Sequence, residues 1–241
     1  MSDLRIDEIW RYPVKSMLGE SLSSANVTEF GIEGDRAWGL RDLETGKTLT
    51  GRREPQLLFA AATVVDGQVV ITLPDGTETA DDADLTSWLG RDVALVPATG
   101  EVGTYEIQLD FETEVGEWFE WQGPEGSFHD STKTRVSLVS AATMRDWEPS
   151  RFRMNLILSG TDEESFIGSE VQVGADGPRL TVIKEVDRCI MVTRPQHGGI
   201  DRDLDVLKTI NNERGGNLGV GANVVAPGSI AVGDAIAVAA E

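Results

Sequence analysis

Short runs of β-branched and apolar residues, separated by turn signals, constrain the fold of this chain more than any other feature. Such runs occupy residues 6–12, 37–41, 57–65, 69–73, 93–97, 136–139, 155–158, 170–173, 179–186, 222–225 and 229–238. Turn sequences such as Asp66-Gly67 and Asp176-Gly177-Pro178 lie between them. Many short strands at this spacing favour a barrel or a sandwich over alternating strands and helices. We therefore predict a mainly β, barrel-type protein.

Few segments have helical character. Residues 84–89, 140–147 and 204–211 are predicted as short helices, the second with Ser140 as its N-cap. Helices this short and this widely spaced would cover the ends of barrels and would not form a bundle of their own.

The composition narrows the class of protein. The formal net charge of −20 argues against nucleic acid and against an anionic membrane as partners, because both would be repelled. The N-terminus lacks the apolar core of a signal peptide, and the longest apolar stretch, residues 57–65, is too short to span a bilayer. A single cysteine cannot form an internal disulfide, which suits a reducing compartment. We expect a soluble cytoplasmic protein.

The segment from residue 92 to residue 130 is rich in Asp, Glu and aromatic residues and contains no Lys or Arg. A charge run of this kind is most often a solvated surface. We interpret residues 99–126 as an acidic connecting segment, with a surface for docking a partner as the alternative.

Cys189 is the residue most able to take part in chemistry. It could be a packed thiol, a reactive thiol or a metal ligand. The adjacent Arg188 would favour its thiolate, the form that binds metals. The only histidines, His129 and His197, are too widely separated to give the spacing of a zinc site with it. A nucleophilic pair of Cys189 with His197 is conceivable, but the spacing does not demand it.

Basic residues gather in four short segments, 12–16, 34–36, 51–55 and 151–155. Lys15, Arg36 and either Arg52 or Arg53 could converge on a phosphate, with charge-assisted bonds of about 1.5–3 kcal/mol each. The alternative is pairing with the abundant surface carboxylates, at about 0–1 kcal/mol per pair.

Several motifs occur together in one order along the chain. They are Tyr12-Pro13-Val14-Lys15-Ser16, Gly34-Asp35-Arg36-Ala37-Trp38, Arg52-Arg53-Glu54-Pro55, Phe152-Arg153-Met154-Asn155-Leu156, Phe166-Ile167-Gly168, Arg188-Cys189 and Pro227-Gly228-Ser229-Ile230-Ala231-Val232-Gly233-Asp234. With them the chain resembles the two-part MOSC proteins, such as the mitochondrial amidoxime-reducing component and bacterial reductases of N-hydroxylated compounds. The resemblance implies an N-terminal β-barrel domain, placed at residues 1–98, and a MOSC barrel domain at residues 99–241.

The resemblance also implies a molybdenum cofactor, Mo-molybdopterin, with Cys189 as metal ligand and catalytic residue. The implied cofactor contacts are Lys15, Ser16, Arg36, Arg52, Arg53, Asp130, Ser131, Arg153, Asn155, Asp187 and Arg188. The match is looser around His129-Asp130-Ser131-Thr132, and Met154 replaces the proline of the family's Phe-Arg-Pro-Asn. After the cysteine, Thr193-Arg194-Pro195-Gln196-His197-Gly198-Gly199 departs from the family's Thr-x-Asp-Pro-x-Thr-Gly, which leaves the substrate open.

The leading hypothesis is a molybdenum-dependent oxidoreductase that reduces N-oxygenated small molecules such as hydroxylamines and amidoximes. The chain has no room for the pyridoxal-phosphate domain of cofactor sulfurases, and one cysteine cannot supply the four of a [2Fe–2S] domain. Electrons would therefore come from a separate donor protein of ferredoxin, flavoprotein or cytochrome b5 type. The alternatives are a non-catalytic carrier of molybdenum cofactor or sulfur that uses Cys189, and a metal-free barrel with a structural cysteine.

Overall fold

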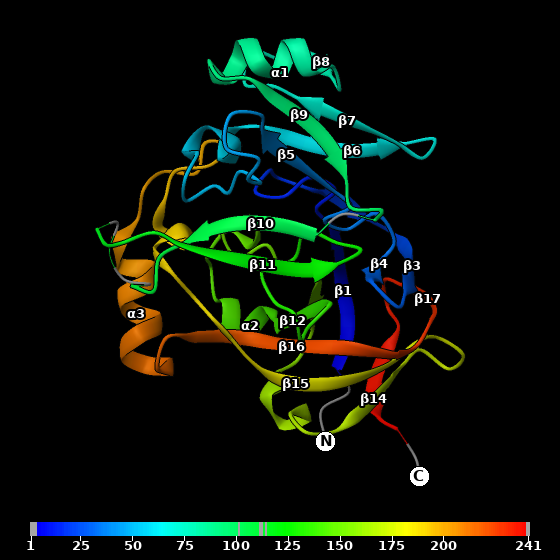
Figure 1. Cartoon of the computed structure of the whole chain (residues 1–241). Helices are drawn as coiled ribbons and strands as arrows, with labels where there is room; N and C mark the ends of the chain where they lie inside the picture. The colour runs from blue at the N-terminus through cyan, green and yellow to red at the C-terminus, as the bar shows by residue number, and fades with distance from the viewer. Residues whose placement is uncertain (1–3, 101, 111–112, 114, 240–241) are drawn as a thin grey trace.

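The largest sheet of the protein closes into a seven-strand barrel (Figure 1). The structure is a computed structural model that describes residues 4–100, 102–110, 113 and 115–239. The barrel strands are β1 (Leu4–Arg11), β12 (Val136–Ser140), β13 (Leu156–Leu158), β14 (Glu170–Val173), β15 (Arg179–Asp187), β16 (Asn217–Ala226) and β18 (Ala235–Val238). They follow the order β13-β12-β16-β15-β14-β18-β1, and pairing of β1 with β13 closes the ring. Only the β12–β13 pair is parallel among these neighbours. The mainly β, barrel-type fold is confirmed.

Strand β1 ties the beginning of the chain to the barrel that its second half builds. Alternate residues of β1 are buried, as expected for a strand with one face toward a core, and Ile6 lies opposite Leu158. Ile6, Ile9, Leu138 and Leu156 are all within 1% of complete burial. Each contributes about 1.5–3 kcal/mol of hydrophobic stabilisation, so the barrel depends on residues that lie more than 120 positions apart in sequence.

Residues 38–97 surround a second core with two smaller sheets. One pairs β5 (Trp38–Asp42) with β9 (Val93–Pro97), and the other joins β6 (Ala61–Val65), β7 (Gln68–Thr72) and β8 (Glu78–Thr79). Helix α1 (Asp82–Leu89) covers them at the top of Figure 1. It starts where Asp81 accepts a hydrogen bond from the Ala83 amide and ends at Gly90, which adopts the left-handed backbone of a C-cap.

The two halves of the chain meet again in a three-stranded sheet of order β17-β3-β4. Strand β17 (Gly228–Ala231) pairs with β3 (Ser24–Thr28), which pairs in turn with β4 (Gly31–Ile32). Strand β2 (Glu20–Leu22) extends the barrel sheet from β1. Val27, Ile32 and Ile230 of this sheet pack into the barrel core, so segments from both halves of the chain contribute to it.

The predicted helices are present, with small changes in extent. Besides α1 they are α2 (Ala141–Met144), which Ser140 caps, and α3 (Leu204–Arg214). Short 3-10 turns complete the described elements: η1 (Pro55–Phe59), η2 (Pro149–Arg151), η3 (Glu163–Phe166) and η4 (Ile190–Thr193). Within the described residues no helix is long and apolar enough to cross a membrane.

The acidic segment has more structure than the sequence indicated. Its described residues include β10 (Val102–Ile107) and β11 (Phe119–Glu125), two antiparallel strands that we call the arm together with the described residues between them. The arm lies above β12 and β16 in the view of Figure 1. Tyr105 stacks on Trp121 with ring centroids 5.4 Å apart and is buried beside Phe128. The acidic connecting segment thus contains two paired strands, and the aromatic residues among the acidic ones give these strands a small core of their own.

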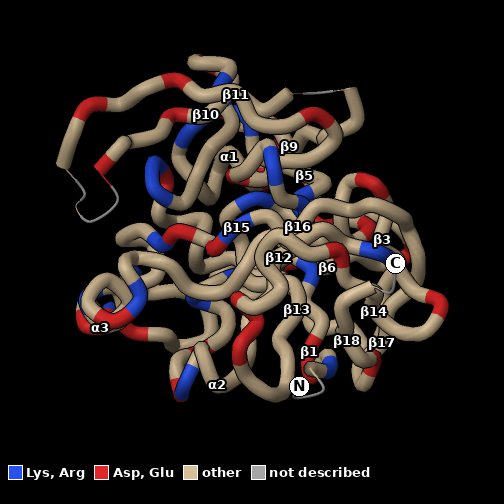
Figure 2. The backbone as a smooth tube through the Cα atoms, turned by 90° about the horizontal axis from the view of Figure 1, so that it is seen from below, with Lys and Arg blue, Asp and Glu red and all other residues tan. Residues whose placement is uncertain are grey.

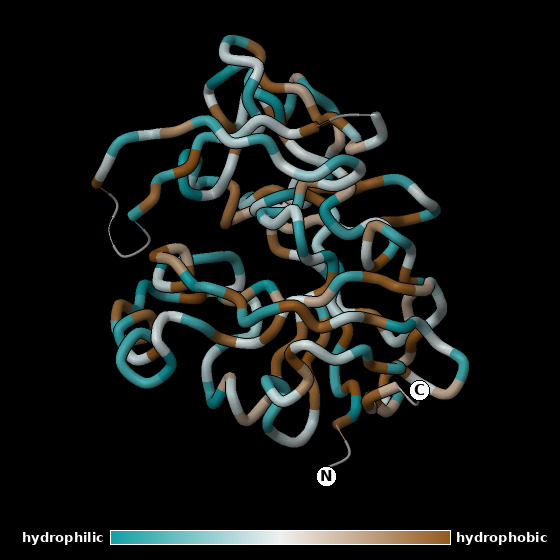
Figure 3. The backbone as a smooth tube through the Cα atoms, turned by 60° about the horizontal axis from the view of Figure 1, so that its bottom comes forward, coloured by the Kyte–Doolittle hydropathy of each residue, from teal (hydrophilic) through white to brown (hydrophobic). Residues whose placement is uncertain are grey.

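Two predicted strands are divided in the structure. In residues 57–65 the first part belongs to η1, since Pro55 starts a helical turn more readily than a strand. In residues 229–238 a turn at Gly233, with a φ of 95°, separates β17 from β18. Hydropathy alone could not place these breaks: Figure 3 shows brown, apolar backbone continuing through much of the barrel region, with teal at many turns.

Candidate functional site

Cys189 follows the end of β15 and caps η4. Burial raises the pKa of its thiol above the usual range, although the Met191 amide and the charges of Arg52 and Arg188 lower it. Arg188 does favour the thiolate, as predicted, but burial outweighs its charge, so the pKa of the thiol stays above the usual range in the protein without a metal. A bound metal would reverse this balance, since thiolates coordinate metals and thiols do not.

The Arg188 guanidinium is directed toward backbone carbonyls. It donates to the carbonyl oxygens of Phe152 at 2.9 Å and Leu218 at 2.7 Å, and burial lowers its pKa to about 10. Arg188 thus ties the cysteine to the 152–154 segment and to β16. Its neighbour Asp187 is exposed and pairs with Lys184 at 2.7 Å. A cofactor contact by either residue stays a prediction.

Two arginines from distant segments lie on the ring of Tyr12. The guanidinium carbons of Arg36 and Arg153 are 4.8 Å and 5.0 Å from the ring centroid. The Arg36 guanidinium donates to Asp35 Oδ2 at 2.5 Å and to the Arg153 carbonyl at 2.9 Å. Both arginines have positive φ, 49° and 53°, a conformation that costs about 1–3 kcal/mol and tends to occur at functional sites.

Arg153 is the least satisfied of these cations. Its guanidinium contacts the Tyr12 ring, but it forms no hydrogen bond or ion pair with an acceptor in the described part of the chain. Burial lowers its pKa to about 10, and the charge of Arg36 adds to this shift. A partly buried guanidinium without an anion is costly, so this position suits an anionic ligand.

Lys15 is almost completely buried, with 4% of its surface exposed. Its ammonium group donates to the Phe128 carbonyl at 3.0 Å, pairs with Asp130 at 2.6 Å and lies 4.4 Å from the centroid of the Tyr105 ring. Asp130 acts electrostatically on Lys15, Arg36 and Arg153, and also on Cys189. Asp130 is therefore close enough to act electrostatically on both the cysteine and the buried cations.

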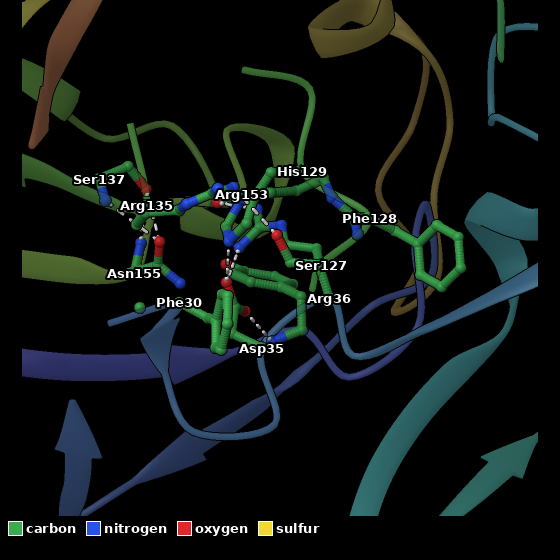
Figure 4. A network of polar contacts seen from close by, with 12 residues as sticks. Phe30, Asp35, Arg36, Ser127, Phe128, His129, Arg135, Ser137, Arg153 and Asn155 are labelled. Carbon is green, nitrogen blue, oxygen red and sulfur yellow. Dashed lines mark hydrogen bonds and ion pairs between the residues drawn. The ribbon is translucent and has the colours of Figure 1, made fainter. Parts of the chain in front are cut away.

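A group that we call the cation cluster emerges from these contacts. It consists of Lys15, Arg36, Arg135 and Arg153 with the carboxylates of Asp35 and Asp130. Four cations against two carboxylates leave an excess of two positive charges, even without Arg188. This excess lies inside a chain of net charge −20. Figure 4 shows Asp35, Arg36, Arg135 and Arg153 together, and Figure 2 shows acidic residues widely spread along the rest of the backbone.

The residues of the 51–55 segment separate in space. Ser16 has a φ of 71°, and its hydroxyl accepts from the Gly51 amide at 2.7 Å. Arg52 donates to the carbonyls of Asp110 and Thr113 in the arm, while its buried Nε has no partner among the described residues. Arg53 pairs with Glu106 and lies on the Trp118 ring. Of the two arginines, Arg52 is the one whose charge reaches Cys189.

Two further predicted contacts have clear structural roles. Asn155 is 1% exposed, and its Oδ1 accepts from the amide and hydroxyl of Ser137 while its Nδ2 donates to the Trp10 carbonyl. The Ser131 hydroxyl accepts from the amides of Lys133 and Thr134, which shapes the Asp130 loop. The structure thus brings Lys15, Arg36, Arg153 and Asp130 together and gives Asn155 and Ser131 internal partners.

Sequence reasoning did not single out Tyr12, Asp35 or Arg135. Tyr12 and Asp35 belong to the same motifs as Lys15 and Arg36, so only their roles were missed. Arg135 precedes β12 outside every motif, and the one hydrogen bond of its guanidinium within the described chain is to the Ser127 hydroxyl at 3.2 Å. No local signal in the sequence indicates that it reaches the cluster.

Comparison with known proteins bears on these residues. The MOSC N-terminal beta barrel domain matches residues 3–120, and the MOSC domain matches residues 123–237. The chain is a two-domain MOSC protein. Residues of this MOSC protein are 37% identical to the mitochondrial amidoxime reducing component 2 of Bos taurus over 73 positions. That match covers 29% of this chain and 21% of the relative, so the chain spans about a fifth of that relative's length.

Solved structures with similarity to the MOSC protein include the YuaD protein of Bacillus subtilis, with 13% identity and a TM-score of 0.46 over 97% of this chain and 93% of that one. YiiM of Geobacillus stearothermophilus has 16% identity and a TM-score of 0.35 over 44% of this chain and 55% of that one.

Proposed function

We propose that this MOSC protein is a molybdenum-cofactor-dependent oxidoreductase that reduces N-oxygenated small molecules such as hydroxylamines and amidoximes. In this proposal Cys189 is the metal ligand, and the cation cluster receives the phosphate of the pterin cofactor. The MOSC family and the partial similarity to a mitochondrial amidoxime reducing component support it. The separate donor protein and the N-oxygenated substrate are parts of the same proposal.

The uncompensated charge of the cation cluster is the observation that carries the proposal. A phosphate monoester has a charge of about −1.5 to −2 at neutral pH, which matches the excess of two positive charges. Arg153 has no described acceptor, and the buried Nε of Arg52 is also without one. The donor set therefore fits a phosphate-bearing group whose other end reaches a soft thiolate.

In this arrangement the cofactor and the protein would have different roles. When bound, the cofactor supplies the two-electron redox chemistry at its metal, which no side chain of the protein can provide. Removing oxygen from an N–OH group consumes two electrons and two protons and releases the amine and one water. The protein's own residues would hold the cofactor, keep the cysteine next to it through Arg188, and hold Lys15 in its buried position through the ion pair with Asp130.

The first test is the metal content of protein produced in a host that makes the cofactor. We expect about one molybdenum per chain by elemental analysis, with loss of the metal in Cys189→Ala and retention of the folded state by circular dichroism. No other cysteine in the chain can replace the thiolate. Metal content equal to that of the unmodified protein in Cys189→Ala would contradict the proposal.

The second test is turnover. The loaded protein should reduce benzamidoxime to benzamidine with dithionite-reduced methyl viologen, and Arg153→Gln should hold less cofactor than the matched surface variant Arg202→Gln. Bound molybdenum without any turnover of hydroxylamines or amidoximes would instead favour the carrier function.

A further inference from the structure

His129 is enclosed at the edge of the cation cluster with part of its imidazole unused. Only 9% of its side chain is exposed, and its Nε2 forms no hydrogen bond within the described part of the protein. Asp35 Oδ2 lies 3.7 Å from His129 Nε2, and this oxygen already accepts a hydrogen bond from Arg36. Figure 4 shows His129 in one group with Asp35, Arg36 and Arg153.

The charged groups that act on His129 come from three segments of the chain. Arg36 and Asp35 follow β4, Arg135 precedes β12, and Lys15 follows β1. Three of these four groups are cations. Burial and the charge of Arg36 lower the pKa of His129 to about 3, so the imidazole is neutral at physiological pH. An imidazole nitrogen left without a partner in such a place loses a hydrogen bond that water would have given it.

Arg135 adds a second cation whose charge acts on His129. Its guanidinium donates to the Ser127 hydroxyl, and it has no carboxylate partner among the described residues. Burial lowers the pKa of Arg135 as well. His129 Nε2 and the Arg135 guanidinium thus have hydrogen-bonding capacity that the described part of the protein does not fully use.

We propose that His129 is a further ligand of the phosphate group held by the cation cluster, and that it takes up a proton from solvent when this dianion binds. In the resulting complex the protonated imidazole donates from Nε2 to a phosphate oxygen, with Arg36, Arg135 and Arg153 around it. This inference rests on the proposed phosphate site, but it does not depend on molybdenum or on turnover.

The coupling has an electrostatic cause. Without an anion, a proton on His129 would raise the excess of the cluster from two to three positive charges in a poorly solvated place. A dianion removes that excess, and the same proton then joins a neutral cluster and gains an anionic partner. Binding and protonation therefore assist each other, and the phosphate dianion should bind more tightly below the pKa that His129 has in the complex than above it.

The experiment uses the cofactor-free full-length protein with inorganic phosphate and, separately, phenyl phosphate as probes. The chain has only two histidines, so His197 is an internal control for the imidazole signals in NMR. We expect saturating probe to raise the pKa of His129 from about 3 by about three units, to about 6 or above, and to leave the His197 signal unchanged. Calorimetry at pH 6 in buffers of different ionisation enthalpy should then show more proton uptake than the same titration of His129→Gln, because the ionisation of the probe itself is common to both proteins.

Two variants separate the ligand role from a structural one. His129→Gln keeps a hydrogen-bond donor but cannot be protonated, so it should abolish the proton uptake and weaken binding at pH 6 by about tenfold. His197→Gln should change neither. A preference for phenyl phosphate indicates a phosphate ester as the natural ligand, and equal affinity indicates free phosphate as sufficient.

Two results would overturn the inference: binding of phosphate without any change at His129, or a folded protein that binds neither probe. The first leaves the proposed function intact, provided that the metal content depends on Cys189. Failure of the proposed function would instead appear as absence of molybdenum while His129 still responds to phosphate.

Discussion

At the scale of single residues, several side chains and backbone positions of the site adopt conformations or environments that are unfavourable in the protein without a ligand. Two arginines adopt positive φ on one tyrosine ring, a lysine is almost fully buried, and a histidine remains neutral beside cations. Each feature costs free energy in the protein alone. Such costs persist when the surrounding structure fixes the residues, and a ligand of opposite charge can offset them.

The neutral state of His129 gives a pH dependence of stability. His129 has a pKa of about 6.5 in the unfolded chain and of about 3 in the folded protein. Between these two pH values the unfolded state therefore binds more protons than the folded state. The free energy of unfolding should therefore fall as the pH falls below 6.5, by up to about 1.4 kcal/mol per unit from this residue. Urea unfolding of the cofactor-free protein at pH 7.5, 6.5 and 5.5 measures it. His129→Gln should show a shallower loss, and parallel curves would contradict the expectation.

Arg36 has a structural partner that any test of cofactor retention must consider. Asp35 is fully buried and accepts from the Tyr12 amide at 2.7 Å as well as from Arg36. Arg36→Ala should lower the free energy of unfolding by about 3–5 kcal/mol, because it leaves a buried carboxylate without its cation. The double variant Asp35→Asn with Arg36→Ala should recover part of this loss in urea unfolding. Cofactor retention should remain below that of Arg202→Ala in both variants, and equal retention would make the Gly34-Asp35-Arg36 motif purely structural.

At the scale of elements, the barrel and the site share their supports. Strand β1 closes the barrel against β13 and continues into the segment that holds Tyr12 and Lys15. The 152–155 segment that carries Arg153 enters β13, and Asn155 joins it to Ser137 of β12 and Trp10 of β1. A change in the pairing that closes the barrel should therefore also displace the residues of the cation cluster.

Asn155→Ala tests this coupling. The substitution removes hydrogen bonds to Ser137 and Trp10 in a place without access to water, and we expect a loss of about 2–4 kcal/mol in the free energy of unfolding. The exposed variant Asn212→Ala is a suitable control, with an expected change below about 0.5 kcal/mol. A small effect on stability together with a large loss of cofactor would instead identify Asn155 as a direct contact.

At the scale of the whole molecule, the proposed chemistry needs electrons from outside this chain. The sequence has a single cysteine and no glycine-rich dinucleotide fingerprint after a strand. We expect NADH or NADPH alone to give no reduction of benzamidoxime by the loaded protein, and an added flavoprotein, ferredoxin or cytochrome b5 with its reductase to restore it. Steady turnover with NADH and the purified chain alone would contradict this prediction.

The arm offers a way to examine where such a donor docks. Glu117 is exposed, whereas Glu120 pairs with Lys47 at 2.9 Å, so reversal at Glu117 is the cleaner change. If the arm is the docking surface, Glu117→Lys should slow turnover with a protein donor and leave turnover with methyl viologen unchanged. Equal rates with both reductants would make the arm a solvated surface.

The sequence by itself determined the class of fold and the ordered motifs, because alternation, turn residues and capping residues act locally. It indicated the position of α1, the Ser140 cap, and strands β9 and β14 at their observed bounds. It also indicated Lys15, Arg36, Arg153 and Cys189 as chemically important residues. The motifs name these residues without stating which of them meet.

Only the tertiary structure decided the rest. Closure of the barrel by β1 brings Tyr12 under two arginines from segments more than 110 residues apart, and no local pattern encodes such a contact. The same packing turned the adjacent Arg52 and Arg53 toward different neighbours and gave Asn155 internal partners. It also raised the pKa of Cys189 and lowered that of His129, because burial depends on what the whole chain places around a group.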